Sequence, residues 1–292
     1  MSTWQNYLRP KSVEDALAGL ATAPRPAVPI AGGTDLLLDL QQGNHPPVRT
    51  LVDLTAVPEM TDLSLRAGQL FIGAAVPLSR IIASELVQEH AQCLVEAAQL
   101  VAGPQVRNTA TLGGNIVHAL PAADGTIALT VLEVQVEIAD RQGRHFTPLA
   151  ELFAGPGRSS LDPQNQLLVG FYLPKRKAHQ ASAFRRIMRA QGIALPILNL
   201  STWLERNGKR VHDVRFAVGP GGPTPWRARS AEEALRGLPY GSAARAEVRA
   251  ALLREVHFRT SAYRASQEYR TELVCSLLDE ALAAAWERAG KV

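Results

Sequence analysis

Cysteine is scarce in this chain. Only Cys93 and Cys275 occur among its 292 residues, far apart and each within a helix-like pattern. Two thiolates cannot supply the four that an iron–sulfur cluster or a Cys₄ zinc site requires. The sequence therefore indicates two buried, reduced thiols, and any metal redox centre that works with this protein must lie on another chain.

Long apolar runs are also missing. No stretch approaches the roughly 18 consecutive apolar residues of a membrane span, and the N-terminus lacks a basic segment followed by an apolar one. We therefore expect no membrane span and a cytoplasmic location. Basic residues exceed acidic ones only slightly, 31 against 27, and form no long run. The composition therefore gives no indication of nucleic-acid binding.

Recognisable catalytic motifs are absent as well. The seven histidines, among them His45, His118 and His145, show no metal-ligand spacing. No G-x-S-x-G motif occurs, and neither cysteine lies in an obviously electropositive segment. We therefore expect neither a catalytic residue nor a metal ligand in this chain.

The apolar pattern predicts an α+β fold in three parts, with boundaries at residues 1–60, 61–175 and 176–292. In the first part Ser12 can cap a helix. An apolar strand over residues 27–31 follows, then a helix that opens at Thr34 and a strand over residues 48–54.

The second part is predicted to open with a hairpin over residues 63–72. Helical periodicity then runs from residue 79 to 101 and ends at Gly103-Pro104. An irregular segment is expected after Gly114, before the alternating strand at 132–138.

The third part is predicted to be a three-stranded antiparallel sheet with helices. Its strands cover residues 181–189, 195–206 and 211–218, and Asn207-Gly208 forms the second hairpin turn. Ser230-x-x-Glu233 is typical of a capping box. A long helix with one apolar face closes the chain at residues 266–286.

Two diglycine turns carry the chemistry, at residues 31–35 and 111–115. Glycine allows a close approach of the backbone and a positive φ, so consecutive N–H groups can point at one anion. Thr34 adds a hydroxyl donor to the first turn, and Asn115 adds an amide to the second. Two such turns could close on the two halves of a pyrophosphate, although each one alone is weak evidence.

Several ordered segments together resemble the FAD subunits and domains of the xanthine dehydrogenase and aerobic carbon monoxide dehydrogenase family, the molybdenum hydroxylases. The resemblance covers nearly the whole chain and is carried by residues 7–10, 12–16, 30–37, 105–115, 121–124, 168–174 and 264–270. It implies a two-part FAD-binding domain of the PCMH type followed by a C-terminal α+β domain.

The resemblance also implies which residues bind FAD. In the family the two glycine turns bind the pyrophosphate, the segment from residue 29 also lines the adenosine end, and single positions elsewhere surround the rest of the cofactor. Carried over to this sequence, the positions are Pro29, Ile30, Ala31, Gly32, Gly33, Thr34, Asp35, Leu36, Val101, Thr111, Gly113, Gly114, Asn115, Asp124, Leu168 and Arg185.

The resemblance further implies partners. A small subunit would carry 2Fe-2S clusters and a large subunit a molybdenum–pterin centre, in a dimer of such heterotrimers. Electrons would pass from the partner's clusters through FAD to NAD, a quinone or dioxygen.

The sequence departs from the family's pattern at three places. Leu120 replaces a small polar residue, Gly192 replaces a common Asp, and residues 126–128 lack a frequent proline. Two alternatives therefore stay open: a self-sufficient FAD-dependent oxidase, and a scaffold that has lost flavin and only assembles the complex.

Overall fold

The chain begins with a small parallel sheet. In the computed structural model, which describes residues 4–189 and 195–291, strands β1 (Asn6–Leu8) and β2 (Ala27–Ile30) both pair in parallel with β3 (Thr50–Asp53). Parallel strands need crossover connections, and α1 (Val13–Thr22) supplies the first. Ser12 caps this helix as predicted, accepting a hydrogen bond from the amide of Asp15 at 3.0 Å.

The second crossover contains α2 (Leu36–Gln42), which begins two residues later than the prediction from Thr34. The hydroxyl of Thr34 does not cap the helix, because it donates to the carboxylate of Asp35 at 3.4 Å. Two 3₁₀ helices, η1 (Leu54–Ala56) and η2 (Glu59–Thr61), lead out of this first sheet.

A five-stranded antiparallel sheet forms the middle of the molecule. In sheet order its strands are β4 (Leu63–Arg66), β5 (Gln69–Gly73), β10 (Leu167–Pro174), β6 (Gln135–Asp140) and β7 (Gly143–Pro148). The predicted hairpin over residues 63–72 is β4–β5. Between β7 and β10, η3 (Leu149–Leu152) leads into a small hairpin of β8 (Phe153–Gly155) and β9 (Arg158–Ser159).

Helices connect β5 to β6, and here two predictions are wrong. The single helix expected over residues 79–101 is three helices, because the Ser84 side chain caps a new one and Ala91 leaves the helical region at φ −144°. The irregular segment expected after Gly114 is also largely helical. The six helices are α3 (Leu78–Ala83), α4 (Glu85–His90), α5 (Gln92–Leu100), α6 (Pro104–Arg107), α7 (Leu112–Val117) and α8 (Asp124–Thr130).

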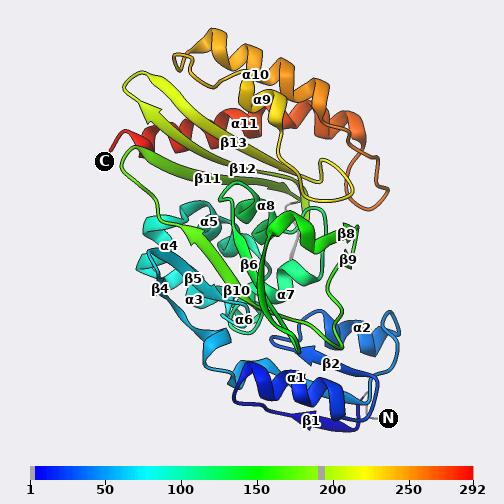
Figure 1. Cartoon of the computed structure of the whole chain (residues 1–292). Helices are drawn as coiled ribbons and strands as arrows, with labels where there is room; N and C mark the ends of the chain where they lie inside the picture. The colour runs from blue at the N-terminus through cyan, green and yellow to red at the C-terminus, as the bar shows by residue number, and fades with distance from the viewer. Residues whose placement is uncertain (1–3, 190–194, 292) are drawn as a thin grey trace.

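The predicted three-stranded antiparallel sheet is confirmed in the C-terminal part. It consists of β11 (Gln180–Met188), β12 (Pro196–Asn207) and β13 (Arg210–Gly219). Alternate residues serve different cores: Phe184 packs with the middle part and Ala183 with the C-terminal helices. Figure 1 shows the sheet between these two layers.

Two helices pack on the outer face of that sheet, α9 (Arg229–Glu233) and α11 (Gln267–Ala289), and α10 (Ser242–Glu255) packs on these two from outside. Ser266 caps α11, and the predicted apolar stripe of this helix is buried. The capping box at Ser230 is wrong, since α9 already begins at Arg229. The buried Glu232 carboxylate fixes this short helix instead, because it accepts a hydrogen bond from the amide of Phe216 at 3.0 Å.

The predicted part boundaries near residues 60 and 176 each fall between strands of different sheets. One hydrophobic core nevertheless runs from Val13 through the middle part to Ala217. Because the parts share this core, their division at residues 60 and 176 stays a proposal. Within the described residues, no helix has the length and apolar character needed to cross a membrane.

Candidate cofactor-binding site

The first glycine turn presents a row of backbone donors. It follows the end of β2 and leads into α2, and Gly33 adopts a φ of +68°, a conformation that glycine takes without strain. Within the described part of the chain, no hydrogen bond uses the amides of residues 32–36 as donors. Successive free N–H groups in a turn form an anion-binding concavity.

The second glycine turn lies directly against the first. A Cβ on Gly32 would come within 2.2 Å of the carbonyl oxygen of Thr109, so only glycine permits this approach. Likewise, a Cβ on Gly113 would lie 2.5 Å from the carbonyl oxygen of Ala74. These two glycines therefore pack the backbone, and they bring residues 31–35 beside residues 109–115.

The second turn offers fewer backbone donors than the sequence predicts. It is the first turn of α7, and Gly114 does not have a positive φ. Its amides are already engaged: Gly113 donates to the carbonyl oxygen of Ala74 at 2.8 Å, and Gly114 donates to Oγ1 of Thr111 at 3.1 Å. What this turn offers is the Asn115 side chain, whose Oδ1 is buried without a hydrogen-bond partner in the described residues.

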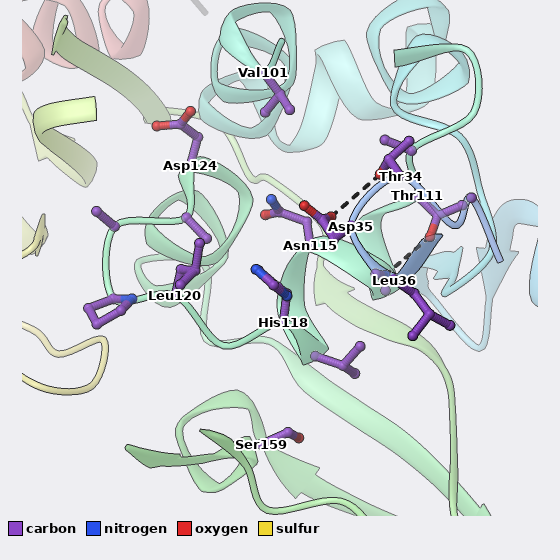
Figure 2. A pocket seen from close by; sticks show the side chains of 18 of the residues that line it. Thr34, Asp35, Leu36, Val101, Thr111, Asn115, His118, Leu120, Asp124 and Ser159 are labelled. Atoms are coloured by element: carbon purple, nitrogen blue, oxygen red, sulfur yellow. Dashed lines mark hydrogen bonds between the residues drawn. The ribbon is translucent and has the colours of Figure 1, made fainter. Parts of the chain in front are cut away.

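Both turns line one cavity of about 1480 Å³. Figure 2 shows Thr34, Asp35 and Leu36 on one side of it, Leu120 and Asp124 on the other, and Asn115 and His118 between them. The structure places nearly the whole predicted site on its wall, namely Pro29, Ile30, Ala31, Gly32, Gly33, Thr34, Asp35, Leu36, Val101, Thr111, Gly113, Gly114, Asn115, Asp124 and Leu168.

Arg185 is the exception among the predicted residues. It does not line the cavity, and its guanidinium forms an ion pair with Glu96 at 3.3 Å. Neighbouring residues of a strand point to opposite faces, and it is Arg186 that reaches the cavity wall.

A buried polar network closes one end of the cavity. The Asp124 carboxylate forms an ion pair with Arg186 and accepts a hydrogen bond from Nδ2 of Asn199 at 2.6 Å. Burial raises the pKa of Asp124, whereas the positive charge of Arg186 opposes that rise. The network joins the start of α8 to β11 and β12, so Asp124 connects two parts of the fold as well as lining the cavity.

The C-terminal part supplies a basic wall that sequence reasoning did not assign to the site. Arg259, Arg264 and Arg270 line the cavity together with Tyr263. Arg270 is buried, and its Nε donates to the carbonyl oxygen of Ile197 at 3.0 Å. Burial lowers the pKa of both Arg264 and Arg270. Arg264 and Arg270 lie in residues 264–270, one of the segments that resemble the family, so the sequence offered a signal for these two. Nothing in the sequence pointed to Arg259.

These walls fit a dinucleotide cofactor such as FAD. The cavity exceeds the roughly 300–1,000 Å³ of ordinary ligand pockets, the amides of residues 32–36 can receive a diphosphate, and the arginines add positive charge. The described residues hold no group of three or more His, Cys, Asp or Glu side chains that could bind a metal ion.

Comparison with known proteins gives two consecutive family matches. Residues 2–176 match the FAD binding domain in molybdopterin dehydrogenase, and residues 182–285 match the CO dehydrogenase flavoprotein C-terminal domain. The chain is 31% identical over 291 residues to the xanthine dehydrogenase FAD-binding subunit of Escherichia coli O157:H7, with 98% of both chains covered.

A second relative and a solved structure agree with this match. The chain is 28% identical over 288 residues to the carbon monoxide dehydrogenase medium chain of Hydrogenophaga pseudoflava, with 97% of both covered. It superimposes with a TM-score of 0.90 and 28% identity on carbon monoxide dehydrogenase from the same organism, in a form lacking the Mo-pyranopterin moiety. That superposition covers 97% of this chain and 98% of the other.

Proposed function

The chain belongs to the family of FAD-binding subunits of the xanthine and carbon monoxide dehydrogenase type, and from this we propose that it relays electrons within a molybdenum hydroxylase. The observation that carries the proposal is the match over almost the full length of separate FAD-binding and medium subunits.

In this proposal the chain's own residues hold and orient FAD, which supplies reversible one- and two-electron chemistry when bound. The amides of residues 32–36 bind the diphosphate, and Asn115 adds a polar contact beside them. The arginines of the C-terminal wall place positive charge along the opposite side of the cavity.

The partners follow from the same reasoning. The chain has two cysteines, Cys93 buried and Cys275 partly buried, so a cluster that exchanges electrons with FAD must belong to another subunit. We propose a small subunit with 2Fe-2S clusters and a large subunit with molybdenum–pterin, assembled as a dimer of heterotrimers in the cytoplasm. The final acceptor would be NAD, a quinone or dioxygen.

The scaffold alternative is weakened by the first turn, whose free amides still form an anion-binding concavity. Leu120 lines the cavity without filling it, and Gly192 lies outside the described residues. The oxidase alternative is left to experiment.

Native mass spectrometry of the complex purified from its own host tests the relay. We expect this chain with two different partners, one of them rich in cysteine. Chromatography after denaturation should release FAD, in about 1:1 ratio to the chain, because no residue here is assigned to a covalent link. Recovery as a monomer or homodimer that turns over an organic substrate directly would establish the oxidase instead, and recovery without any flavin would establish the scaffold.

A further inference from the structure

A second cavity lies at the other end of the C-terminal sheet. It encloses about 500 Å³ and is lined by His90 at the end of α4, by Pro174 at the end of β10 and residues 175–177 after it, and by Glu205 near the end of β12. The FAD cavity instead includes Pro196 at the start of β12. Since a strand rises by ~3.3 Å per residue, the two cavities lie roughly 30 Å apart. Figure 1 shows α4 on the opposite side of the molecule from β8 and β9.

Three consecutive cations in this wall have no carboxylate partner in the described structure. Lys175 and Lys177 are exposed and form no ion pair there. Arg176 donates only to carbonyl oxygens, to that of Glu89 at 2.8 Å and to that of Gln180 at 3.3 Å. Their positive charge is therefore available to a ligand.

The acidic residues of the same wall are already engaged. Glu133 pairs with Arg215 at 2.9 Å, and Asp213 pairs with Arg236 at 2.9 Å. Glu205 accepts a hydrogen bond from Nε2 of Gln180 at 2.8 Å. Glu133 and Asp213 therefore neutralise the wall's other arginines, whereas Glu205 keeps its charge because its partner is a neutral amide. With five basic and three acidic residues, the wall keeps an excess of two positive charges, centred on the segment 175–177.

His90 gives an independent indication of a ligand. Its side chain is only 3% exposed, and Nδ1 has no hydrogen-bond partner in the described residues. The nearest carboxylate, that of Glu89, lies 4.0 Å from Nε2. Nε of Arg215, on the same cavity wall, is likewise buried without a partner. Buried polar atoms without partners are rare in folded proteins, and the Nδ1–H tautomer of a neutral imidazole can donate to an anion.

We propose that this second cavity binds a phosphate group, held by Lys175, Arg176 and Lys177 and by the buried N–H of His90. A phosphate offers several acceptor oxygens and nearly two negative charges, which match three cations and a buried donor better than a single carboxylate does. The site does not depend on FAD or on the proposed electron relay. Because residues 175–177 connect β10 to β11, the ligand would bind where the middle part joins the C-terminal sheet.

Calorimetric titration of the full chain with inorganic pyrophosphate tests the site. Prior saturation with FAD keeps the anion out of the first cavity, and a parallel titration without FAD keeps the result independent of the cofactor assignment. With FAD bound we expect one site, whose affinity falls at least roughly tenfold in Lys175→Gln/Lys177→Gln, because hydrogen bonds to charged groups are strong. Lys11→Gln/Arg254→Gln removes the same charge from exposed positions outside the wall of this cavity and should bind normally.

Lysine acetylation read by mass spectrometry locates the ligand. Pyrophosphate should protect Lys175 and Lys177 and leave Lys11 reactive. Titrations with inorganic phosphate and with ADP then distinguish a free phosphate from a phosphate ester, and saturable binding of either supports the site. Absence of binding, or equal affinity in the two double variants, overturns the proposal. Loss of partner subunits from Lys175→Gln/Lys177→Gln without any anion binding would make this surface a protein interface instead.

Discussion

Gly32→Ala tests whether the contact between the two glycine turns positions the phosphate donors. The new Cβ would lie 2.2 Å from the carbonyl oxygen of Thr109, roughly 1 Å closer than the ~3.3 Å at which carbon and carbonyl oxygen normally meet. Both groups belong to the backbone, so no side-chain rotation relieves the overlap and residues 31–35 must move. Overpacking of this kind costs about 1–3 kcal/mol of stability.

The movement should weaken FAD binding more than it weakens the fold. If two amides of residues 32–36 lose their hydrogen bonds to the diphosphate, at about 1.5 kcal/mol each, the affinity falls on the order of 100-fold. The measurement is a titration of the apo chain with FAD, in which quenching of the flavin fluorescence reports binding. The thermal midpoint of the apo variant shows whether it has folded.

Gly43→Ala is the matched control at the other end of α2. Gly43 has a φ of +74°, and a Cβ there would meet no atom within 4 Å. Alanine in this conformation costs about 1 kcal/mol of stability but leaves the cavity wall unchanged. If Gly32→Ala binds FAD within about threefold of the wild type, or if both variants lose the same affinity, the assignment of the diphosphate to this turn is wrong.

Three further predictions concern buried polar groups. Asn199→Ala should lower the free energy of unfolding, measured by urea denaturation, by about 1–3 kcal/mol. The reason is that Nδ2 of Asn199 donates to the carbonyl oxygen of Ala122 and to the Asp124 carboxylate. An unchanged urea midpoint would show that this network does not stabilise the fold. Burial holds the pKa of His90 below its ordinary value of 6.5, so the unfolded state binds more protons and stability should fall as pH drops below about 6.5. His90→Gln should flatten that pH dependence. An equal slope of stability against pH in the variant would show that His90 is not its cause. Burial raises the pKa of Cys93 to about 11, so a thiol reagent should label it only after unfolding, and rapid labelling of the native chain would contradict its burial.

Local sequence signals predicted most of the fold. Ser12 and Ser266 each mark a helix start that the structure confirms. The predicted hairpin is also present, but its two-residue loop is Gly208–Lys209, one residue later than predicted. Caps and tight hairpins can be predicted because they depend on a few neighbouring residues. The break at Ala91 could not be predicted in this way. Apolar periodicity continues across it, and the break depends on how three short helices pack on the sheet.

The sequence predicted which residues line the candidate site better than it predicted what each of them does there. Fifteen of the sixteen proposed residues line the cavity, and their contact with FAD stays a prediction. The sequence could not show that Gly32 and Gly113 pack against distant backbone, or that Gly114 lies within a helix. It could also not distinguish Arg185 from Arg186, because the face of a strand depends on a register that only tertiary structure fixes.

The cavity's distribution along the chain has a consequence for biosynthesis. Its walls come from residues 28–39, from 101–124, from 156–168 and finally from 257–270, and β10 completes the middle sheet almost a hundred residues after β5. Contacts between distant segments close slowly during folding, and a ribosome delivers the N-terminal segments first. The amides of the first glycine turn therefore stay hydrated, and the cavity around them stays incomplete, until nearly the whole polypeptide has left the ribosome. Flavin capture should then be a late event of maturation, and a truncated chain ending near residue 255 should fold much of its N-terminal part yet hold flavin poorly.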